Sequence, residues 1–371
     1  MVIISCQMND PTGMDSIRIP GEFEPQEAIW LGYRSVREEG YFENETYKIL
    51  SAIKPKKTMR TSLLIIALLA LHIETMSQDY NGPIIDMHVH AYHEGNPFFR
   101  MRIHPPTLRG ESYTGASSAE ELKQQTLAIF KEHNVVKAVV SDGVLWDDGS
   151  FDDIILYGRR NMTVDSLRDA HSQQKFDVLG ELAPFYSGKV AGDSSLAPLF
   201  GLAEELGAPA GIHIFPGGPN WLWNRFPGMF PLMRAKNADP KQLQEVMIAY
   251  PKMKLYIMHG GWPYVDDVKA LMYMHSQLYV DVAVLNWILP KEEFYAYLKE
   301  LINAGFGDKI MFGSDQMIWP QLIGEGIKTI NEAPFLSLDQ KADIFYNNAA
   351  RFLELTEEEI EAHKKKLLPR N

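Results

Sequence analysis

Histidine and carboxylate side chains recur where the apolar runs of this sequence end. The stretch PIIDMHVHAY, residues 83–92, places His88 and His90 two residues apart behind an apolar run. Side chains at positions i and i+2 of a β-strand lie on the same face, so both imidazoles can reach one ion. The later runs supply Glu181, His213, His259 and Asp315. Zinc, manganese and iron accept imidazole and carboxylate ligands without a thiolate, so the set predicts a divalent metal site.

Each of these residues, taken alone, also has an ordinary structural explanation. Two histidines on an edge strand are often solvated or hydrogen-bonded at the surface. A lone His213 or His259 is often a hydrogen-bonded core residue, because buried polar groups normally have partners. Glu181 could be a partly exposed acid that pairs with a neighbouring cation. The order of all six residues along the chain is what favours a common site.

The composition is that of a globular protein without thiolate chemistry. Of the 371 residues, 46% are hydrophobic and 23% are charged, which is typical of a chain that folds. Cys6 is the only cysteine, and this excludes an intrachain disulfide and a cysteine-rich zinc site. The formal net charge of −12 provides no general attraction to nucleic acid or anionic lipid. We therefore expect a small-molecule substrate as the partner, and the oligomeric state, including a homo-oligomer, stays open.

The elements that must position these residues alternate in type after Gln78. Short apolar runs and amphipathic stretches follow one another, which predicts βα units and a parallel sheet. The expected strands cover residues 84–89, 136–141, 153–157, 177–182, 210–214, 254–258, 278–283 and 309–313. Eight such runs predict an α/β fold with a closed (β/α)8 TIM barrel, although the third run could instead begin a helix. The carboxyl ends of barrel strands converge on one face, where active sites form.

Helical patterns and one long insertion lie between the expected strands. The helices cover residues 119–133, 164–174, 196–206 and 240–250, and a C-terminal helix covers residues 338–355. The insertion FPGGPNWLWNRFPGMFP is too long and irregular for a simple turn, and such loops often carry binding surfaces. Trp262 is the preferred candidate for substrate binding, because it directly follows the His-Gly-Gly turn. The other candidates near the same rim are Trp146, Arg159, Tyr186, Trp221, Trp223 and Arg225.

The assembled order His-x-His, Glu, His, His, Asp over a β/α array resembles the amidohydrolase superfamily of metal-dependent hydrolases. The matching stretches lie within residues 80–357 and read IIDMHVH, GIHIFPG, YIMHGGWP, IMFGSDQ and YNNAARFLEL. They are most similar to the amidohydrolase-2 branch. This branch contains decarboxylases, lactonases and hydrolases of small carboxylated compounds.

The resemblance implies a role for each candidate residue. In such a site, the ligands of the main metal would be His88, His90, His213 and Asp315. His259 would be a second-metal ligand or a catalytic general base. The stretch GELAPFY resembles strand four of TatD-type nucleases, whose Glu touches both ions, so Glu181 would be a ligand in a two-metal site and need not be one in a one-metal site. Zinc is the first expectation, with manganese or iron as alternatives and with one or two ions.

The expected chemistry follows from such an ion. A bound divalent cation lowers the pKa of its water from about 16 to about 7 and polarises a carbonyl. Asp315 is placed to take the proton of that water and to pass it to a leaving group. We therefore expect a hydrolase that uses a metal-bound hydroxide on an ester, lactone or amide of a small molecule. The alternatives are a non-oxidative decarboxylase of the same fold and a non-catalytic exported protein that binds metal.

Residues 59–77 predict an export signal rather than a barrel unit. The sequence MRTSLLIIALLALHIETMSQ has one arginine, then an apolar run, then small and polar residues with a plausible cut after Ser77, as in a secretory signal peptide. The apolar run is too short for a stable membrane span, which needs roughly 20 residues. A buried core helix is the alternative. Translation from Met59 would give an exported, periplasmic or secreted protein, and otherwise the protein would be cytoplasmic.

Residues 15–34, DSIRIPGEFEPQEAIWLGYR, resemble the opening of agmatine deiminases and related peptidylarginine deiminases. Those enzymes need a nucleophilic cysteine far downstream, and this chain has none beyond Cys6, so no deiminase activity is implied. We interpret residues 1–58 as a fragment without its own function, followed by the signal-like segment and by an amidohydrolase domain over residues 78–371. A true N-terminal extension that packs on the main domain is the alternative.

Overall fold

The computed structural model describes residues 78–101, 104–151, 153–226, 228 and 230–366, with the side chains of Met101, Trp221 and Trp223 excepted. The two predicted segments at residues 1–58 and 59–77 lie outside the described residues, so their interpretations stay predictions. Among the described helices, none is long and apolar enough to cross a membrane.

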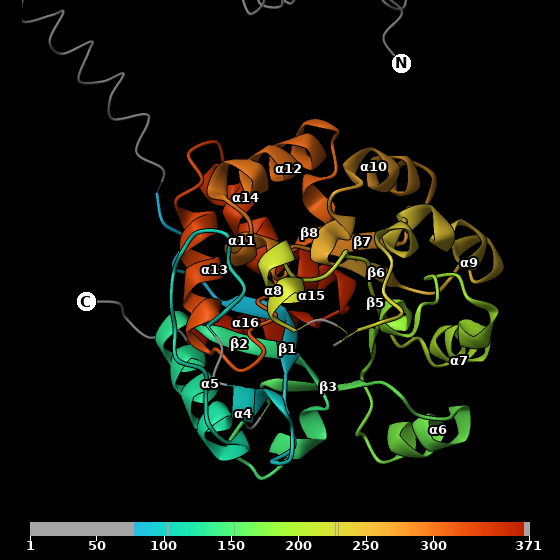
Figure 1. Cartoon of the computed structure of the whole chain (residues 1–371), viewed down its shortest axis with the longest axis horizontal. Helices are drawn as coiled ribbons and strands as arrows, with labels where there is room; N and C mark the ends of the chain where they lie inside the picture. The colour runs from blue at the N-terminus through green and yellow to red at the C-terminus, as the bar shows by residue number, and fades with distance from the viewer. Residues whose placement is uncertain (1–77, 102–103, 152, 227, 229, 367–371) are drawn as a thin grey trace, which may run out of the picture. The chain divides into compact units, whose positions relative to one another are not determined.

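Eight parallel strands form one sheet in which the spatial order follows the sequence (Figure 1). They are β1 (Ile84–His90), β2 (Val135–Ser141), β3 (Ile155–Arg159), β4 (Val178–Leu182), β5 (Ala210–His213), β6 (Leu255–Met258), β7 (Leu278–Asp281) and β8 (Ile310–Met311). The first strand also contacts the chain around the last, since Met87 N donates to Phe312 O at 2.9 Å and Asp315 N donates to His88 O at 2.7 Å. The predicted (β/α)8 barrel is therefore confirmed, and its third run is a strand.

An outer ring of helices surrounds the strands in Figure 1. It includes α5 (Ala119–His133), α6 (Val164–Ser172), α7 (Ala197–Leu206), α9 (Gln244–Ala249), α10 (Val265–Met274), α12 (Lys291–Asn303) and α13 (Gln321–Asn331). Local sequence fixes their ends: α5 begins after Ser118, whose side chain accepts from Glu121 N, and ends at Asn134 in the left-handed conformation. Three of the predicted helices match α5, α6 and α7 to within two residues, whereas residues 240–250 form a 3-10 turn followed by α9.

Short helices lie in the loops at the carboxyl ends of the strands. They are α4 (Phe98–Met101) after β1, α8 (Asn220–Arg225) after β5, and α11 (Leu285–Ile288) after β7. The helix α8 falls inside the long insertion that the sequence indicated. The loop after β5 is thus partly helical rather than wholly irregular.

The C-terminal segment is helical without a break over residues 338–352, close to the predicted 338–355, with a π-helical turn in its middle. It forms α14 (Leu338–Ala342), a π-helical turn and α15 (Asn348–Phe352), and α16 (Glu357–Lys365) follows. The side chain of Asn348 explains where α15 docks. Its Nδ2 donates to Gly307 O and Ile310 O, both at 2.8 Å, which ties the helix to the start of β8.

The core contains two apolar clusters. The larger one includes apolar side chains of both the strands and the outer helices, and the smaller one joins strand residues such as Met87 and Tyr256 to Phe352 of α15. Tyr256 fits because its neighbour in the sheet is a glycine. A Cβ atom on Gly211 would lie 2.5 Å from Tyr256 Cζ, so a larger residue there would displace the ring.

Candidate metal centre

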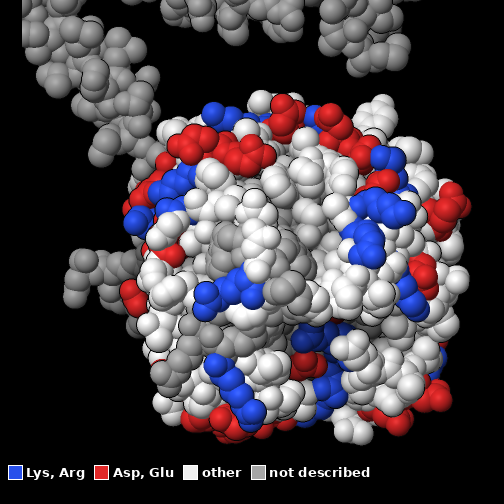
Figure 2. Space-filling view, viewed as in Figure 1, with Lys and Arg blue, Asp and Glu red and all other residues white. Residues whose placement is uncertain are grey.

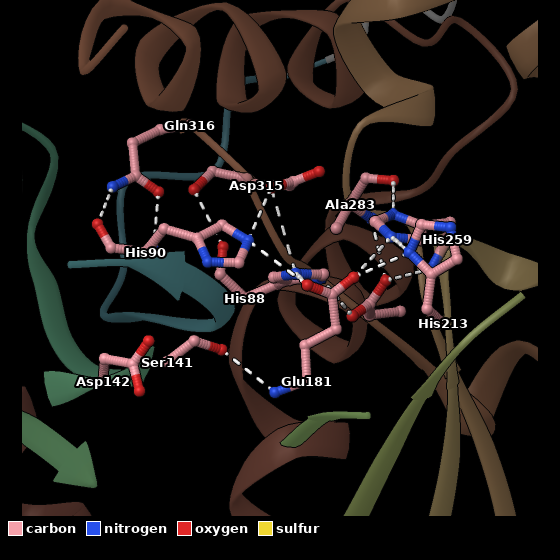
Figure 3. Close-up of polar contacts among 12 residues, drawn as sticks. His88, His90, Ser141, Asp142, Glu181, His213, His259, Ala283, Asp315 and Gln316 are labelled. Carbon is pink, nitrogen blue, oxygen red and sulfur yellow. Dashed lines mark hydrogen bonds and ion pairs between the residues drawn. The ribbon is translucent and has the colours of Figure 1, made fainter. Parts of the chain in front are cut away.

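The six predicted metal and catalytic residues converge at the carboxyl end of the barrel (Figure 3). They are contributed by β1, β4, β5 and the segments that follow β6 and β8, and they are His88, His90, Glu181, His213, His259 and Asp315. None of them is more than 7% exposed. The two histidines of β1 are therefore not surface residues, and Glu181 is not partly exposed, although it does lie beside a cation, Arg160.

His88, His90 and Asp315 form the first group of donors. Asp315 Oδ1 lies 3.0 Å from His90 Nε2 and 3.9 Å from His88 Nε2. Gln316 holds the backbone of His90, because its Oε1 accepts from His90 N at 3.0 Å and its Nε2 donates to His90 O at 2.7 Å. The ring of Tyr92 stacks on the His90 ring with centroids 5.5 Å apart. Ligand atoms of the three donors lie within 4.8 Å of one another, which is close enough for one ion.

His213 and His259 form the second group, and ligand atoms of His259, Glu181 and His88 also lie within 4.8 Å of one another. His213 Nδ1 lies 2.9 Å from His259 Nε2 and 2.7 Å from Glu181 Oε1, and His259 Nε2 lies 3.3 Å from the same oxygen. The resemblance implied that His213 would join His88 and His90. His213 lies beside His259, because β5 and β6 are neighbours in the barrel, and its assignment to the ion of His88 and His90 stays a prediction.

Glu181 lies between the two groups. Its Oε1 faces His213 and His259, whereas its Oε2 lies 3.5 Å from His90 Nε2 and 3.9 Å from His88 Nε2. Each carboxylate oxygen thus faces a different pair of imidazoles (Figure 3). This arrangement suits a carboxylate that contacts two ions or that stands between an ion and a base.

The outward nitrogens of the second group face carbonyl oxygens. His213 Nε2 lies 3.1 Å from Phe215 O, and His259 Nδ1 lies 3.3 Å from Ala283 O. A carbonyl oxygen can only accept a hydrogen bond, so each ring carries its proton on this side. The inward nitrogens, His213 Nδ1 and His259 Nε2, face Glu181 Oε1, and a metal ion among them or protons on the two rings would balance its negative charge. Ligating histidines typically have this outer acceptor, so the donor set fits a divalent metal.

Burial and hydrogen bonding act in opposite directions on the two carboxylates. Burial raises the pKa of Glu181, but hydrogen bonds from the surrounding histidines outweigh it and leave the pKa well below its usual range. Burial also raises the pKa of Asp315, and the charge of His88 and the hydrogen bond of His90 bring it below the ordinary value. Both groups are therefore ionised at neutral pH, as a metal ligand must be.

The histidines His88 and His213 have pKa values shifted in opposite directions. Burial lowers the pKa of His88, but the nearby carboxylates, Asp315 foremost, raise it well above the usual value. Burial and the neighbouring His259 lower the pKa of His213 despite its contact with Glu181. His213 is thus neutral at pH 7, whereas His88 must release a proton when a metal binds.

Four residues that line the site have the left-handed backbone conformation. Their φ angles are 62° for His259, 63° for Val284, 48° for Asp315 and 47° for Met317. This region is uncommon for non-glycine residues and a genuine outlier for a β-branched residue such as Val284. Such conformations cluster at functional sites, where the surrounding structure holds them. Here Trp287 Nε1 donates to Ser314 O at 2.7 Å and fixes the segment that carries Asp315.

A cavity of about 300 Å³ lies over the donors. Figure 2 shows that uncharged residues occupy much of the centre of this view, with charged residues more frequent toward its edge. The apolar and aromatic residues that line the cavity are Tyr92, Phe98, Pro106, Tyr186, Phe215, Leu222, Phe230, Met233, Val284, Ile288, Met317 and Trp319. The chamber is thus polar at the metal donors and largely apolar elsewhere, which is the usual construction of a small-molecule site.

Comparison with protein families agrees with this geometry. The sequence model of the amidohydrolase family, in its amidohydrolase-2 form, matches residues 85–355. The chain belongs to the amidohydrolase family. It is accordingly an enzyme of the amidohydrolase superfamily. A search of curated proteins gave no match to the sequence.

Solved structures with the same fold are distant in sequence. An uncharacterized TIM-barrel protein from Bordetella bronchiseptica is 18% identical, with a TM-score of 0.55 over 73% of this chain and 98% of its own. A probable 2-pyrone-4,6-dicarboxylic acid hydrolase from Acinetobacter baumannii, with citric acid bound, is 14% identical, with a TM-score of 0.50 over 73% and 99% of the two chains. A 5-carboxyvanillate decarboxylase from Novosphingobium aromaticivorans, complexed with manganese and a nitrobenzoic acid, is 11% identical, with a TM-score of 0.51 over 76% and 99%. These likenesses support the fold of this amidohydrolase.

The predicted substrate-binding residues of the amidohydrolase are distributed differently from the metal donors. Tyr186 lines the cavity and packs on His213 with ring centroids 5.0 Å apart. Trp262 is not among the lining residues; its Nε1 donates to Glu293 Oε1 at 3.0 Å, and its ring lies against Phe215. The side chain of Trp221 lies outside the described set, so its role stays a prediction.

Arg160 lines the cavity, whereas the predicted Arg159 does not. Ser141 pairs with Gly158 on the neighbouring strand, and paired residues of parallel strands point to the same face. Arg160 lies two residues beyond Gly158 and shares that face, while Arg159 points the other way. The sequence carries no signal for this register, so Arg160 could be told from Arg159 only once the pairing of Ser141 with Gly158 was known. Its guanidinium lies 3.6 Å from Glu181 Oε2 and 3.2 Å from Asp142 Oδ2.

Proposed function

We propose that this amidohydrolase is a metal-dependent hydrolase that acts on an ester, lactone or amide of a small molecule. The observation that carries the proposal is the position of Glu181, with one carboxylate oxygen facing each group of imidazoles. A divalent ion bound there would supply a Lewis acid for the substrate carbonyl and would lower the pKa of a water molecule. Zinc is the expected metal, with manganese or iron as alternatives.

The geometry supports two ions better than one. His88, His90 and Asp315 would hold the first ion, His213 and His259 would hold the second, and Glu181 would contact both. If only one ion binds, His259 is left to act as a general base. The close contact of His259 Nε2 with Glu181 Oε1, at 3.3 Å, supports either role.

Asp315 is the residue that we assign to proton transfer. It lines the cavity, and its lowered pKa keeps it ionised and able to accept a proton from an attacking water. The same carboxylate can then deliver the proton to the leaving group.

The wall of the cavity indicates the kind of substrate. Its aromatic and aliphatic side chains suit an apolar or aromatic body, which they would also shield from water. Arg160 offers one cationic contact for an anionic group, in competition with its present partners Glu181 and Asp142. The solved hydrolase and decarboxylase of this fold are described with small carboxylated compounds, and a substrate of that class fits the combination of apolar wall and arginine.

A non-oxidative decarboxylase is the second candidate. The combination of an apolar chamber with a guanidinium group favours it, because both features suit an aromatic carboxylate. Such an enzyme would retain one metal, use it to bind the substrate acid, and work without Glu181. The two functions therefore differ in the role of a single side chain.

Substitution of Glu181 and of His88 separates these candidates. The purified chain and its Glu181→Ala and His88→Ala variants would be assayed on panels of esters, lactones and aromatic carboxylates, with metal content measured in parallel. A hydrolase should lose about 10²-fold or more of kcat/KM in both variants. Loss in His88→Ala alone, with carboxylates as the substrates, would identify a decarboxylase.

Exposed Glu300 provides a matched control for these substitutions. It pairs with Lys269 on the outer ring of helices, so Glu300→Ala removes a carboxylate without touching the chamber. Its activity should match that of the unchanged chain. Tight metal binding without turnover on any panel would indicate the non-catalytic metal-binding protein instead.

A further inference from the structure

Asp281, the last residue of β7, is fully buried beneath the metal donors and was not a predicted site residue. Its Oδ1 accepts hydrogen bonds from His259 N at 2.8 Å and from Ala283 N at 3.0 Å. Its Oδ2 lies 3.3 Å from His88 Nδ1. Neither atom makes a hydrogen bond within the described part of the chain, so the two are joined only by this ion-pair contact. Buried polar groups normally have a partner, and these two unpartnered atoms face each other.

We propose that Asp281 is a positioning residue that holds His88 with a proton on Nδ1 and with Nε2 directed at the metal site. The inference rests on the proposed metal-dependent function. A carboxylate accepts hydrogen bonds and does not donate them when ionised, so Nδ1 must be the donor. The opposite nitrogen, His88 Nε2, lies 3.9 Å from both Asp315 Oδ1 and Glu181 Oε2. It is therefore the atom that remains to bind a metal.

The other two imidazoles with an outer acceptor obtain the same orientation from the main chain. His213 faces the carbonyl of Phe215, and His259 faces the carbonyl of Ala283. His88 differs because its outer acceptor is a side chain. Of the three acceptors, Asp281 is thus the one that a substitution can alter without moving the backbone.

The Asp281→Asn substitution would reverse which ring nitrogen of His88 carries the proton. The amide oxygen must stay at the Oδ1 position, because two backbone N–H groups donate to it. The amide NH2 then faces His88 Nδ1, and a donor at this place requires Nδ1 to accept. The proton of a neutral His88 would move to Nε2, where it blocks metal binding.

Asp86 offers a matched control on the neighbouring strand β1. It is also fully buried, and its Oδ1 accepts from His88 N at 3.1 Å and from Ser314 N at 2.9 Å. Its Oδ2 faces no hydrogen-bond partner within the described part of the chain. Asp86→Asn therefore changes a buried carboxylate with two backbone bonds but places no donor against an imidazole ring.

The test uses the full chain loaded with zinc. Nitrogen-15 NMR of the labelled histidines should show His88 with a proton on Nδ1 and without one on Nε2. Zinc titration should show that Asp281→Asn lowers the affinity by about 10- to 100-fold, which is typical for loss of an outer partner of a ligating histidine. Asp86→Asn should stay near the affinity of the unchanged chain, and circular dichroism would confirm that both variants fold.

The possible outcomes separate this inference from the proposed function. Zinc binding by the unchanged chain, combined with unchanged affinity in Asp281→Asn or with a His88 proton on Nε2, overturns the inference and leaves the function standing. Equal losses in both variants also overturn it, because they would reflect only the loss of a buried carboxylate. Absence of zinc binding in the unchanged chain overturns both. If Asp281→Asn fails to fold, the NMR spectrum of the unchanged chain decides the matter alone.

Discussion

At the amino end of the barrel, Phe352 of α15 packs against Tyr256 and Tyr279, with ring centroids 5.5 and 4.8 Å away. At the carboxyl end, six buried polar residues surround a cavity, and ring nitrogens of His88 and His90 lack a hydrogen-bond partner among the described residues. The same strands supply both ends. The first region is an apolar core that closes the barrel, and the second is a concentration of charge that a folded chain holds at a cost.

This difference indicates that the two ends contribute to different properties. Apolar burial at the amino end stabilises the fold, at about 25 cal/mol per Å² of apolar surface. Ionised carboxylates and left-handed residues at the carboxyl end are costly unless a ligand or metal satisfies them. Substitutions at the amino end should therefore reduce stability, whereas substitutions at the carboxyl end should reduce activity. Substitutions at each end test whether stability and activity are separated in this way.

The largest effect is expected for activity after substitution of Asp315. Asp315→Asn removes the proton acceptor and weakens one group of metal donors, so kcat should fall by about 10²- to 10⁴-fold. The free energy of unfolding of the metal-free protein should fall only modestly, because loss of the favourable contacts with His88 and His90 is offset by removal of a buried charge. Steady-state kinetics and urea unfolding would measure both. A large loss of stability with activity intact would contradict the assignment of activity to the carboxyl end and of stability to the amino end.

The opposite result is expected for Phe352 at the amino end. Phe352→Ala leaves a cavity beside Tyr256 and Tyr279, and this should lower the free energy of unfolding by about 3–5 kcal/mol. Zinc affinity of the folded fraction should not change, since the residue belongs to the cluster that α15 covers. Phe352→Leu serves as the control and should cost less. Reduced zinc affinity at full stability would show that the two ends are not separate.

The free energy of unfolding should depend on pH through the buried groups at the carboxyl end of the barrel. In the metal-free protein, Glu181 and Asp315 have lowered pKa values, so the stability they provide is present above about pH 4 and is lost as the pH falls through their folded pKa values. His88 has a raised pKa, so its contribution is complete below about pH 6.5 and is lost as the pH rises through its folded pKa. Stability should thus be greatest between these limits.

Urea unfolding with a chelator, over a range of pH, would test this profile. The loss of stability on the alkaline side should disappear in His88→Ala, which serves as the reference. Zinc should reverse the alkaline loss, because metal binding requires His88 to release its proton. A profile that is identical in His88→Ala and in the unchanged chain would rule out this histidine as the cause.

The smallest effect is expected from removal of residues 1–77. A chain beginning at Gln78 keeps the contacts that hold the start of the described region, since Lys341 Nζ donates to Gln78 O at 2.7 Å and the ring of Tyr80 stacks on Phe345. Its thermal stability and zinc affinity should match those of the full chain. N-terminal sequencing of exported protein should begin after Ser77. A shortened chain that fails to fold would show that the first segment belongs to the working protein.

The features that could be predicted from the sequence are those with a strong local pattern. The eight strands are apolar runs between turn signals, and the six donors stand at or beyond the ends of these runs. The barrel geometry then requires those ends to meet, so His88, His90 and Asp315 could be grouped without coordinates. The alternation of strands and helices thus predicts most of the fold. The histidines and carboxylates at the strand ends predict most of the donor set.

The features that could not be predicted depend on the register of a strand, on the packing of a loop, or on contacts between residues far apart in the sequence. Arg160 was missed in favour of Arg159 because one residue along a strand reverses the face that a side chain occupies. Asp281 lies in an apolar run and gives no sign of its contact with His88, which is far away in the sequence. Trp262 directly follows the His-Gly-Gly turn that begins at His259, yet its indole donates to Glu293. These outcomes are decided by strand register and loop packing.

The position of Glu181 between two groups of imidazoles is the central claim, and a crystal structure of the zinc-loaded protein tests it most directly. Anomalous scattering should reveal two ions, one beside His88, His90 and Asp315 and one beside His213 and His259. Each ion should lie about 2.0–2.2 Å from one oxygen of Glu181. A single ion with Glu181 outside its coordination sphere would contradict the account, and so would the absence of zinc from both groups.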